Sequence, residues 1–434
     1  IIMLNVCVIG DGILGATTCL ELAKMGCKIA WVTRGRKGAA TPAAAAMLNS
    51  FAEIDNFTFR SKFSSTMFEV SMESTLRWPS LYSEVSDFCL RQGSFELSPL
   101  GMGTHVINNT ASDSYEDSNF ELLIASLKKF KQQHTVSSGT SNQLLKNGYS
   151  PEDQSRALRS LFIKNEGFFN PKVFLEAIDR YLVSEWSVQT LKENVIGLKS
   201  EVDGIVVRFE NFDKKFDKVI NCAGVWSESI KEMIELPKTR TPRLFSGVGV
   251  SLELKADIDG FKHCIRTPNR GGACGIYVVP QAAPDHKSNS FIAGASNMMS
   301  LYPQFEPKAA AVSHLINAAA REINVHFEDA TIASINTGNR PITSDLYPLM
   351  GRYGETSVYS LTGTRRDGLH CAPVLSHEIA HLVVNGTYAK FDLEFCNPLR
   401  EPILDISRKS SIKENVAALL SEWFQHGFSV ASHK

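Results

Sequence analysis

The chain has 434 residues, 43% of them hydrophobic and 21% charged, which is the composition of a globular protein with a sizeable core. Its formal net charge of −1 gives no support for binding to nucleic acid or to an anionic membrane. No apolar run approaches the roughly 20 residues that a membrane span needs. The nine cysteines include no C-x-x-C pair, so we expect neither a metal site nor a disulfide framework, and a cytoplasmic location.

The first 35 residues carry the most informative pattern. Residues 5–9 predict a buried strand, residues 16–25 carry the apolar stripe of a helix, and residues 28–32 predict a second, parallel strand. A Gly-x-Gly-x-x-Gly turn separates the first strand from the helix. Alone this motif is weak, but framed by strand, helix and strand it predicts a dinucleotide-binding unit.

The residues of this turn have separate physical roles. Gly10 makes the turn, Gly12 lets the backbone approach a diphosphate, and Gly15 lets the helix pack closely on the strand. Ile13 and Leu14 open the helix, where free N–H groups and the positive end of the helix dipole favour phosphates.

The end of the second predicted strand departs from the pattern. An acidic residue that binds the adenosine ribose is expected there, but Thr33 and Arg34 occupy the place. Arg34 suggests the 2′-phosphate of NADP, so the choice of cofactor depends on the rest of the chain.

The remaining chain mixes helical and strand patterns and has no internal repeat. We expect surface loops at residues 108–119 and 136–142, and helices at 120–133, 172–183, 308–323, 373–384 and 403–427. Strands are expected within 193–209 and at 218–224, 244–254, 276–280, 290–295 and 357–362. The strand at 218–224 ends in small residues, which admit a ligand at the carboxyl edge of a sheet.

Several further segments follow one another in a recognisable order: residues 41–48, 166–171, 221–227, 277–280, 294–296, 338–341 and 363–369. Together with the opening turn they resemble the amino-acid-oxidising flavoproteins related to D-amino acid oxidase and, more closely, glycine oxidase. The resemblance covers most of residues 3–384 and favours FAD over NADP. No cysteine matches a covalent attachment site of the family, so non-covalent FAD is implied.

The resemblance also implies a set of cofactor-binding residues. They are Gly10, Gly12, Ile13, Leu14, Gly15, Thr33, Arg34, Ala44, Ala45, Ala46, Met47, Val195, Cys222, Ala223, Gly224, Trp226, Gly338, Arg366, Asp367, Gly368 and Leu369. Two of them depart from the family, because Thr33 stands where a glutamate is usual and Ala46 where a glycine is usual.

The implied fold is α/β: a Rossmann-type FAD-binding domain with a doubly wound parallel sheet, and an α+β substrate domain with an antiparallel sheet. The predicted FAD-binding domain is discontinuous, at residues 1–95, 165–228 and 330–395. The predicted substrate domain covers residues 96–164 and 229–329, and residues 396–434 form a helical tail.

Three residues are candidates for the chemistry. Arg340 matches the family position that holds the substrate carboxylate, and the alternative is a structural arginine before Pro341. Arg366 is expected near the flavin ring, with a surface salt bridge as the alternative. The Tyr277 hydroxyl is expected to close over the substrate, with a core tyrosine as the alternative.

The resemblance predicts an FAD-dependent oxidoreductase that oxidises the C–N bond of an amino acid or related amine. Once the amine is neutral, hydride transfer to flavin N5 needs no protein base, and the imine is hydrolysed to an oxo acid. Oxygen, which would yield hydrogen peroxide, or another acceptor takes the electrons. A dehydrogenase of a polyol or polyol phosphate, a biosynthetic enzyme for a specialised amine, and a non-catalytic FAD-binding subunit remain alternatives, and a homo-oligomer is possible.

Overall fold

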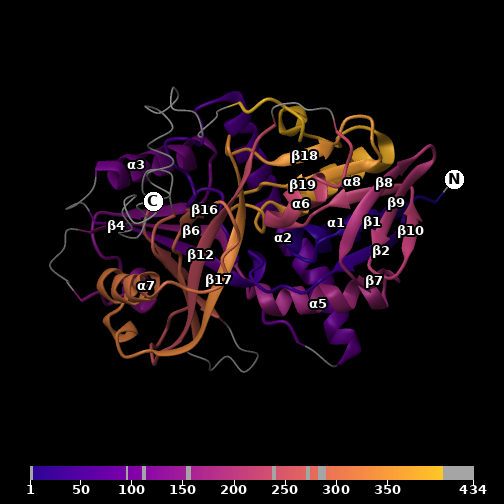
Figure 1. Ribbon diagram of the computed structural model, residues 1–434. Helices are drawn as coiled ribbons and strands as arrows, with labels where there is room; N and C mark the ends of the chain where they lie inside the picture. Colours follow the sequence, from indigo (N-terminus) through magenta and orange to yellow (C-terminus); the bar gives the residue numbers. More distant parts are fainter. Residues whose placement is uncertain are drawn as a thin grey trace.

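The computed structural model describes residues 3–93, 96–109, 114–152, 158–236, 241–269, 274–281 and 290–403. They form two halves, one around a six-stranded sheet that is mostly parallel and one around a ten-stranded sheet that is mostly antiparallel (Figure 1). The predicted combination of a doubly wound parallel sheet with an antiparallel one is confirmed. The domain boundaries stay a prediction.

The parallel sheet contains the opening strand at its centre. Its spatial order is β18 (Leu349–Arg352), β19 (Val358–Thr362), β11 (Lys218–Asn221), β1 (Asn5–Ile9), β2 (Lys28–Thr33) and β7 (Gln189–Lys192). All neighbours run parallel except β18 and β19. The carboxyl ends of β1, β2 and β11 therefore meet at one edge, where ligands bind in such sheets.

Both faces of this sheet are covered. Val6 and Val8 of β1 pack against the helices α1 (Ile13–Lys24), α2 (Lys62–Gln92), α5 (Pro171–Ser184) and α8 (Ala372–Asn385). Cys7 and Ile9 face the opposite way, toward a small sheet of β8 (Val195–Glu201), β9 (Gly204–Phe209) and β10 (Asp213–Phe216). The strict alternation follows from the two-residue period of a strand.

The large sheet forms the other half. Its order is β16 (Met298–Ser300), β12 (Leu244–Lys255), β15 (Ser290–Gly294), β14 (Tyr277–Gln281), β13 (Cys264–Arg266), β4 (Gly101–Asn109), β6 (Leu158–Phe168) and β3 (Met47–Leu48). Two more strands attach to it, β17 (Thr331–Thr343) on β12 and β5 (His134–Ser137) on β6. Helix α7 (Ala309–Glu322) packs its apolar face on this sheet, as α3 (Ser114–Lys129) does at the other end.

The two loops predicted at residues 108–119 and 136–142 are shorter than expected. β4 continues to Asn109, α3 begins at Ser114, β5 ends at Ser137, and the short helix α4 (Asn142–Lys146) follows. Two of the polar side chains that suggested a loop, Asn108 and Asn119, are buried: the Asn108 amide donates to the Asp117 carboxylate, and Asn119 donates to the Asn269 carbonyl oxygen at 2.6 Å. The predicted tail helix at 403–427 lies outside the described residues, apart from its first residue.

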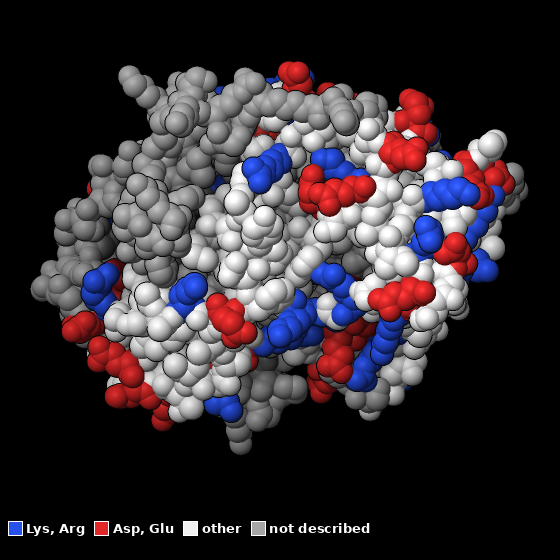
Figure 2. All heavy atoms as spheres, viewed as in Figure 1, with Lys and Arg blue, Asp and Glu red and all other residues white. Residues whose placement is uncertain are grey.

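The surface carries charges of both signs. On the face shown in Figure 2, Lys and Arg side chains alternate with Asp and Glu, and no extended area of one sign stands out. This face offers no basic surface of the kind that nucleic acid requires.

Candidate active site

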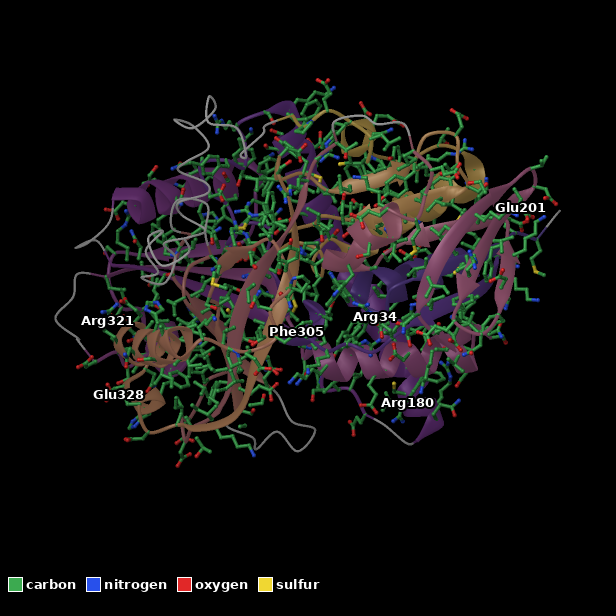
Figure 3. The ribbon with its side chains drawn as sticks, in the orientation of Figure 1. Arg34, Arg180, Glu201, Phe305, Arg321 and Glu328 are labelled. Carbon is green, nitrogen blue, oxygen red and sulfur yellow. The ribbon has the colours of Figure 1, made fainter. Side chains whose placement is uncertain are left out.

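A long pocket opens at the carboxyl edge of the parallel sheet, and most predicted cofactor residues line it. Its wall includes Gly10, Gly12, Ile13, Leu14, Arg34, Ala44, Val195, Cys222, Ala223, Gly224, Trp226, Gly338, Arg340, Arg366, Gly368 and Leu369. Figure 3 shows Arg34 near the middle of the molecule, whereas Glu201 lies at the far tip of the β8–β9 hairpin. We call this cavity the long pocket.

The glycine turn has the shape that its sequence predicts. Gly10 has φ +115°, and a Cβ there would lie 2.4 Å from the Cys222 carbonyl oxygen. A Cβ on Gly15 would lie 1.9 Å from the Gly10 carbonyl oxygen, so Gly15 serves packing and does not line the pocket. At Gly12 the nearest atom, the Thr41 hydroxyl oxygen, is 3.4 Å away. The turn thus leaves room for a ligand only at Gly12, where backbone approach was predicted.

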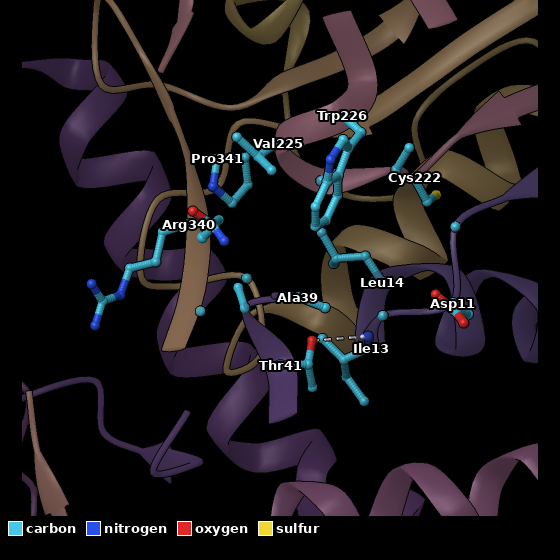
Figure 4. Close-up of a pocket in the computed structure, with 18 of the residues that line it drawn as sticks. Asp11, Ile13, Leu14, Ala39, Thr41, Cys222, Val225, Trp226, Arg340 and Pro341 are labelled. Carbon is cyan, nitrogen blue, oxygen red and sulfur yellow. Dashed lines mark hydrogen bonds between the residues drawn. The ribbon is translucent and has the colours of Figure 1, made fainter. Parts of the chain in front are cut away.

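The N-terminus of α1 is suited to a diphosphate. Gly12 is its N-cap without a side-chain hydrogen bond, and the first turn holds no acidic residue. The Ile13 N–H donates to Thr41 Oγ1 at 3.2 Å (Figure 4). The positive end of the helix dipole at this wall favours an anionic group. Thr41 belongs to a segment recognised in the sequence, but its contact with the turn was not predicted.

The structure departs from the sequence expectation at the end of β2. Thr33 ends β2 but is not part of the pocket wall, and its carbonyl oxygen accepts the Glu193 N–H at 3.1 Å. Glu193, which carries a carboxylate, is itself one of the residues that line the long pocket. The Arg34 guanidinium lies 4.8 Å from the Trp226 ring centroid, a cation–π distance. Arg34 is therefore engaged with a protein ring at the pocket wall.

A smaller cavity, the adjoining pocket, shares Ala44, Arg340, Arg366 and Leu369 with the long pocket. Its other wall residues are Ala45, Ala46, Met47, Asn49, Glu53, Cys274, Tyr277, Ala295, Asp367 and His370. The structure thus brings together the predicted residues Ala45–Met47, Tyr277 and Asp367 in a space next to the long pocket. Residues from four distant parts of the sequence meet there.

Ala46 explains why a glycine is usual at its position. Its φ is +50°, in the left-handed region, and its carbonyl oxygen accepts the Phe169 N–H at 3.3 Å. A residue with a Cβ pays about 1–2 kcal/mol for this conformation. The alanine therefore strains the backbone at the pocket wall.

Arg340 lies on β17 with its guanidinium against the backbone of Gly249 in β12. A Cβ on Gly249 would come within 2.4 Å of both terminal nitrogens. Nη1 donates to the Ser296 carbonyl oxygen and to Asn297 Oδ1, each at 3.2 Å. No carboxylate pairs with Arg340 among the described residues, and its guanidinium points away from the Trp226 end of the long pocket (Figure 4).

Arg366 borders both pockets and forms buried ion pairs. Its Nε lies 3.2 Å from Glu53 Oε2, and its Nη2 lies 3.3 Å from Asp55 Oδ2. The alternative of a surface salt bridge is wrong, because only 11% of the side chain is exposed. Its predicted contact with the flavin ring stays a prediction, but its charge is matched by two carboxylates.

Glu53 and Arg266 form a buried pair that the sequence did not suggest. Arg266 is fully buried, pairs with Glu53, and donates to Asn269 Oδ1 at 2.7 Å. Burial alone would raise the pKa of Glu53, but Arg266 and Arg366 outweigh it and lower that pKa to about 2. Glu53 is therefore an ionised carboxylate that holds the two arginines in place. Nothing in the sequence signalled this role, because Glu53 lies far along the chain from both Arg266 and Arg366.

Tyr277 is buried, and its hydroxyl lies over the backbone of Gly294. A Cβ on Gly294 would be 2.5 Å from that oxygen. No described residue forms a hydrogen bond with this hydroxyl, and burial raises the pKa of Tyr277, which keeps the proton on the oxygen. The hydroxyl can therefore donate to a bound molecule.

His370 is a structural residue of the adjoining pocket. Its Nε2 lies 2.7 Å from Thr75 Oγ1, its carbonyl oxygen accepts the Trp78 indole N–H at 2.7 Å, and burial lowers its pKa to about 4. His263 and Cys264 belong to no possible metal site, because within the described ranges no three His, Cys, Asp or Glu side chains are placed to hold a metal ion.

Searches for similar proteins agree with one another. A family model described as "FAD dependent oxidoreductase" matches residues 5–382. Glycine oxidase from Bacillus licheniformis is 23% identical over 388 residues, which are 87% of this chain and 92% of that protein.

None of the helices in the described ranges is both long enough and apolar enough to cross a bilayer.

Solved structures show the same fold. Glycine oxidase from Geobacillus kaustophilus gives a TM-score of 0.75 at 19% identity, covering 92% of this chain and 99% of that chain. Iminodiacetate oxidase from Chelativorans sp. BNC1 gives 0.73 at 20% identity, covering 91% and 98%. With the family model spanning most of the sequence and the glycine turn built as a dinucleotide site, the chain belongs to the family of FAD-dependent oxidoreductases, and its cofactor is FAD.

Proposed function

We propose that this protein oxidises the C–N bond of a small amino acid or related amine. The observation that carries the proposal is Arg340, a guanidinium without a carboxylate partner among the described residues, which lines both pockets. The planar fork of an arginine suits a substrate carboxylate. The known relatives named glycine oxidase and iminodiacetate oxidase support a substrate of this kind.

FAD would be held without a covalent bond by the residues of the long pocket. Gly12 and the first turn of α1 would hold its diphosphate, Glu193 its ribose, and the segment of Ala44 to Met47 would lie beside its ring. Bound FAD supplies a two-electron acceptor for a hydride. The imine product is hydrolysed to an oxo acid and ammonia or an amine.

The chain's own residues position the substrate. Arg340 binds its carboxylate, and the Tyr277 hydroxyl donates to it from β14, another strand of the same sheet. The methyl groups of Ala45 and Ala295 make part of the remaining wall small and apolar, which favours a short side chain. Holding the reacting C–H bond in one orientation supplies much of the rate enhancement.

The adjoining pocket is poorly suited to a polyol phosphate. A phosphate monoester carries up to two negative charges, whereas Arg366 is already matched by Glu53 and Asp55. Arg340 alone would face the phosphate.

We further propose that the enzyme works in a reducing compartment, the cytoplasm, because all nine cysteines are unpaired.

Anaerobic mixing of the holoenzyme with a panel of amino acids, amines and polyols tests the proposal. We expect loss of the flavin absorbance with amino acids and none with polyols. Bleaching by polyols alone would refute the proposed reaction, and no bleaching by any compound would indicate a non-catalytic subunit. The same mixtures in air, with hydrogen peroxide measured, identify oxygen as the acceptor or exclude it.

A further inference from the structure

Asp367 is a charged residue of the adjoining pocket whose role neither fold nor cofactor explains. Its backbone is held at both ends, since its N–H donates to the Thr364 carbonyl oxygen at 3.0 Å and its carbonyl oxygen accepts the Cys371 N–H at 2.8 Å. No described residue donates a hydrogen bond to its carboxyl oxygens. Within the described ranges, the Asp367 carboxylate therefore has no hydrogen-bond partner.

The other carboxylates nearby are engaged. Glu53 is paired with Arg266 and Arg366, and Asp55 accepts from Arg366. The adjoining pocket thus presents two charged groups that form no ion pair within the described residues, the Arg340 guanidinium and the Asp367 carboxylate. One cation and one anion in one small cavity match the two charged ends of an amino acid.

On the basis of the proposed function, we propose that Asp367 binds the ammonium group of the substrate while Arg340 binds its carboxylate, so that the enzyme takes up α-amino acids as zwitterions. Asp367 then accepts the proton that the ammonium must lose. The N–H bond breaks, its electron pair stays on nitrogen, and the proton bonds to a carboxyl oxygen. The resulting neutral amine is the form from which hydride can leave.

The surroundings of Asp367 favour proton uptake. Burial raises the pKa of Asp367; Arg366 and Arg365 oppose the shift, and the anionic Glu53 and Asp55 add to it. The remaining titratable groups of the pocket are Cys274, Tyr277 and His370, and burial keeps each of them neutral. Asp367 also borders a further cavity whose wall includes the hydroxyl-bearing residues Ser50, Thr58 and Ser64, and this cavity offers the proton a route to solvent.

A pair of ligands that cannot be oxidised tests the ammonium contact. α-Aminoisobutyrate has no Cα–H bond, and pivalate has the same shape with a methyl group in place of the amine. We expect the wild-type holoenzyme to bind α-aminoisobutyrate at least about tenfold more tightly than pivalate, as a hydrogen bond between charged groups implies. In Asp367→Asn this preference disappears, while pivalate affinity is unchanged. Perturbation of the flavin spectrum measures both affinities.

Asp392→Asn, which removes an exposed carboxylate far along the chain, is the control and keeps the wild-type preference. Flavin content and melting temperature show that each variant is folded, and Asp367→Glu should restore part of the preference. An equal preference in wild type and Asp367→Asn, or none in wild type, overturns the inference.

The pH dependence of kcat/KM tests the proton transfer separately. In Asp367→Asn only the free amine reacts, so kcat/KM should rise about tenfold per pH unit up to the pKa of the substrate's own ammonium group. The wild type should level off at lower pH. Identical profiles overturn the proton transfer. If these tests fail but amino acids still bleach the flavin of the wild-type enzyme, the proposed function is retained and only the role of Asp367 is refuted. If no amino acid bleaches the flavin, the proposed function itself fails.

Discussion

Replacing Arg340 by lysine separates a substrate clamp from a structural arginine. In the structure Nη1 is used by Ser296 and Asn297, while Nε and Nη2 donate to no described residue and remain for a carboxylate. Lysine has one nitrogen in place of this fork, so we expect the loss of one charge-assisted hydrogen bond, worth about 1.5–3 kcal/mol. At 1.4 kcal/mol per factor of ten, kcat/KM for an amino acid should fall by about 10- to 150-fold.

The assay compares each amino acid with the amine that lacks its carboxylate. Stopped-flow bleaching of the flavin under nitrogen measures both reactions. We expect the loss to lie mostly in KM, because the contact is made in the ground state as well as the transition state. The amine without a carboxylate should react with the same kcat/KM in the wild type and in Arg340→Lys. An equal loss for amine and amino acid, or an unchanged kcat/KM with a lowered melting temperature, would show that Arg340 serves the fold.

Three further substitutions test other parts of the structure. Gly10→Ala should yield protein without flavin or without stable structure, because the added Cβ would overlap the Cys222 carbonyl. Absorbance of the purified protein measures its flavin content. A full flavin content would contradict the geometry. Ala46→Gly should keep the flavin and change the free energy of unfolding by no more than about 1 kcal/mol, since relief of the left-handed strain is offset by the entropy of glycine, and urea unfolding checks it. His370→Asn should flatten the pH dependence of stability. Burial lowers the pKa of His370 to about 4 in the folded protein, whereas an ordinary histidine has a pKa of 6.5. Between these two pH values the unfolded state binds more protons than the folded state, so stability falls by roughly 3 kcal/mol as the pH drops through that range. An equally steep fall in the variant would assign the effect to other groups.

The match between sequence and structure is closest where the determining contacts are local. The start of α5 is an example: Asn170 accepts the Lys172 and Val173 N–H groups, and Pro171 occupies the first turn. All of these residues lie within four positions, so one short segment of the sequence contains the interactions that start this helix, which was predicted at residues 172–183.

Predictions failed where polar residues are satisfied at a distance. Asn108 and Asn119 belong to a stretch that looks like a surface loop, yet both are buried. Asn108 donates to Asp117 of the same stretch, whereas Asn119 donates to the carbonyl oxygen of Asn269, which lies 150 positions away in the sequence. Thr33 lacks the carboxylate expected after β2, and Glu193, which follows β7, lines the long pocket. Neither Asn269 nor Glu193 lies near these positions in the sequence.

The sequence by itself determined the glycine turn, because the requirement for glycine at Gly10, Gly12 and Gly15 arises from the backbone geometry of one short segment. Only the tertiary structure decided the charges of the adjoining pocket. Arg366 meets Asp55 across 311 positions of sequence, and with Glu53 this long-range ion pair leaves Arg340 and Asp367 as the charged wall residues that form no ion pair among the described residues. Charge pairing depends on distances of a few ångströms in the folded chain, which spacing along the sequence does not encode.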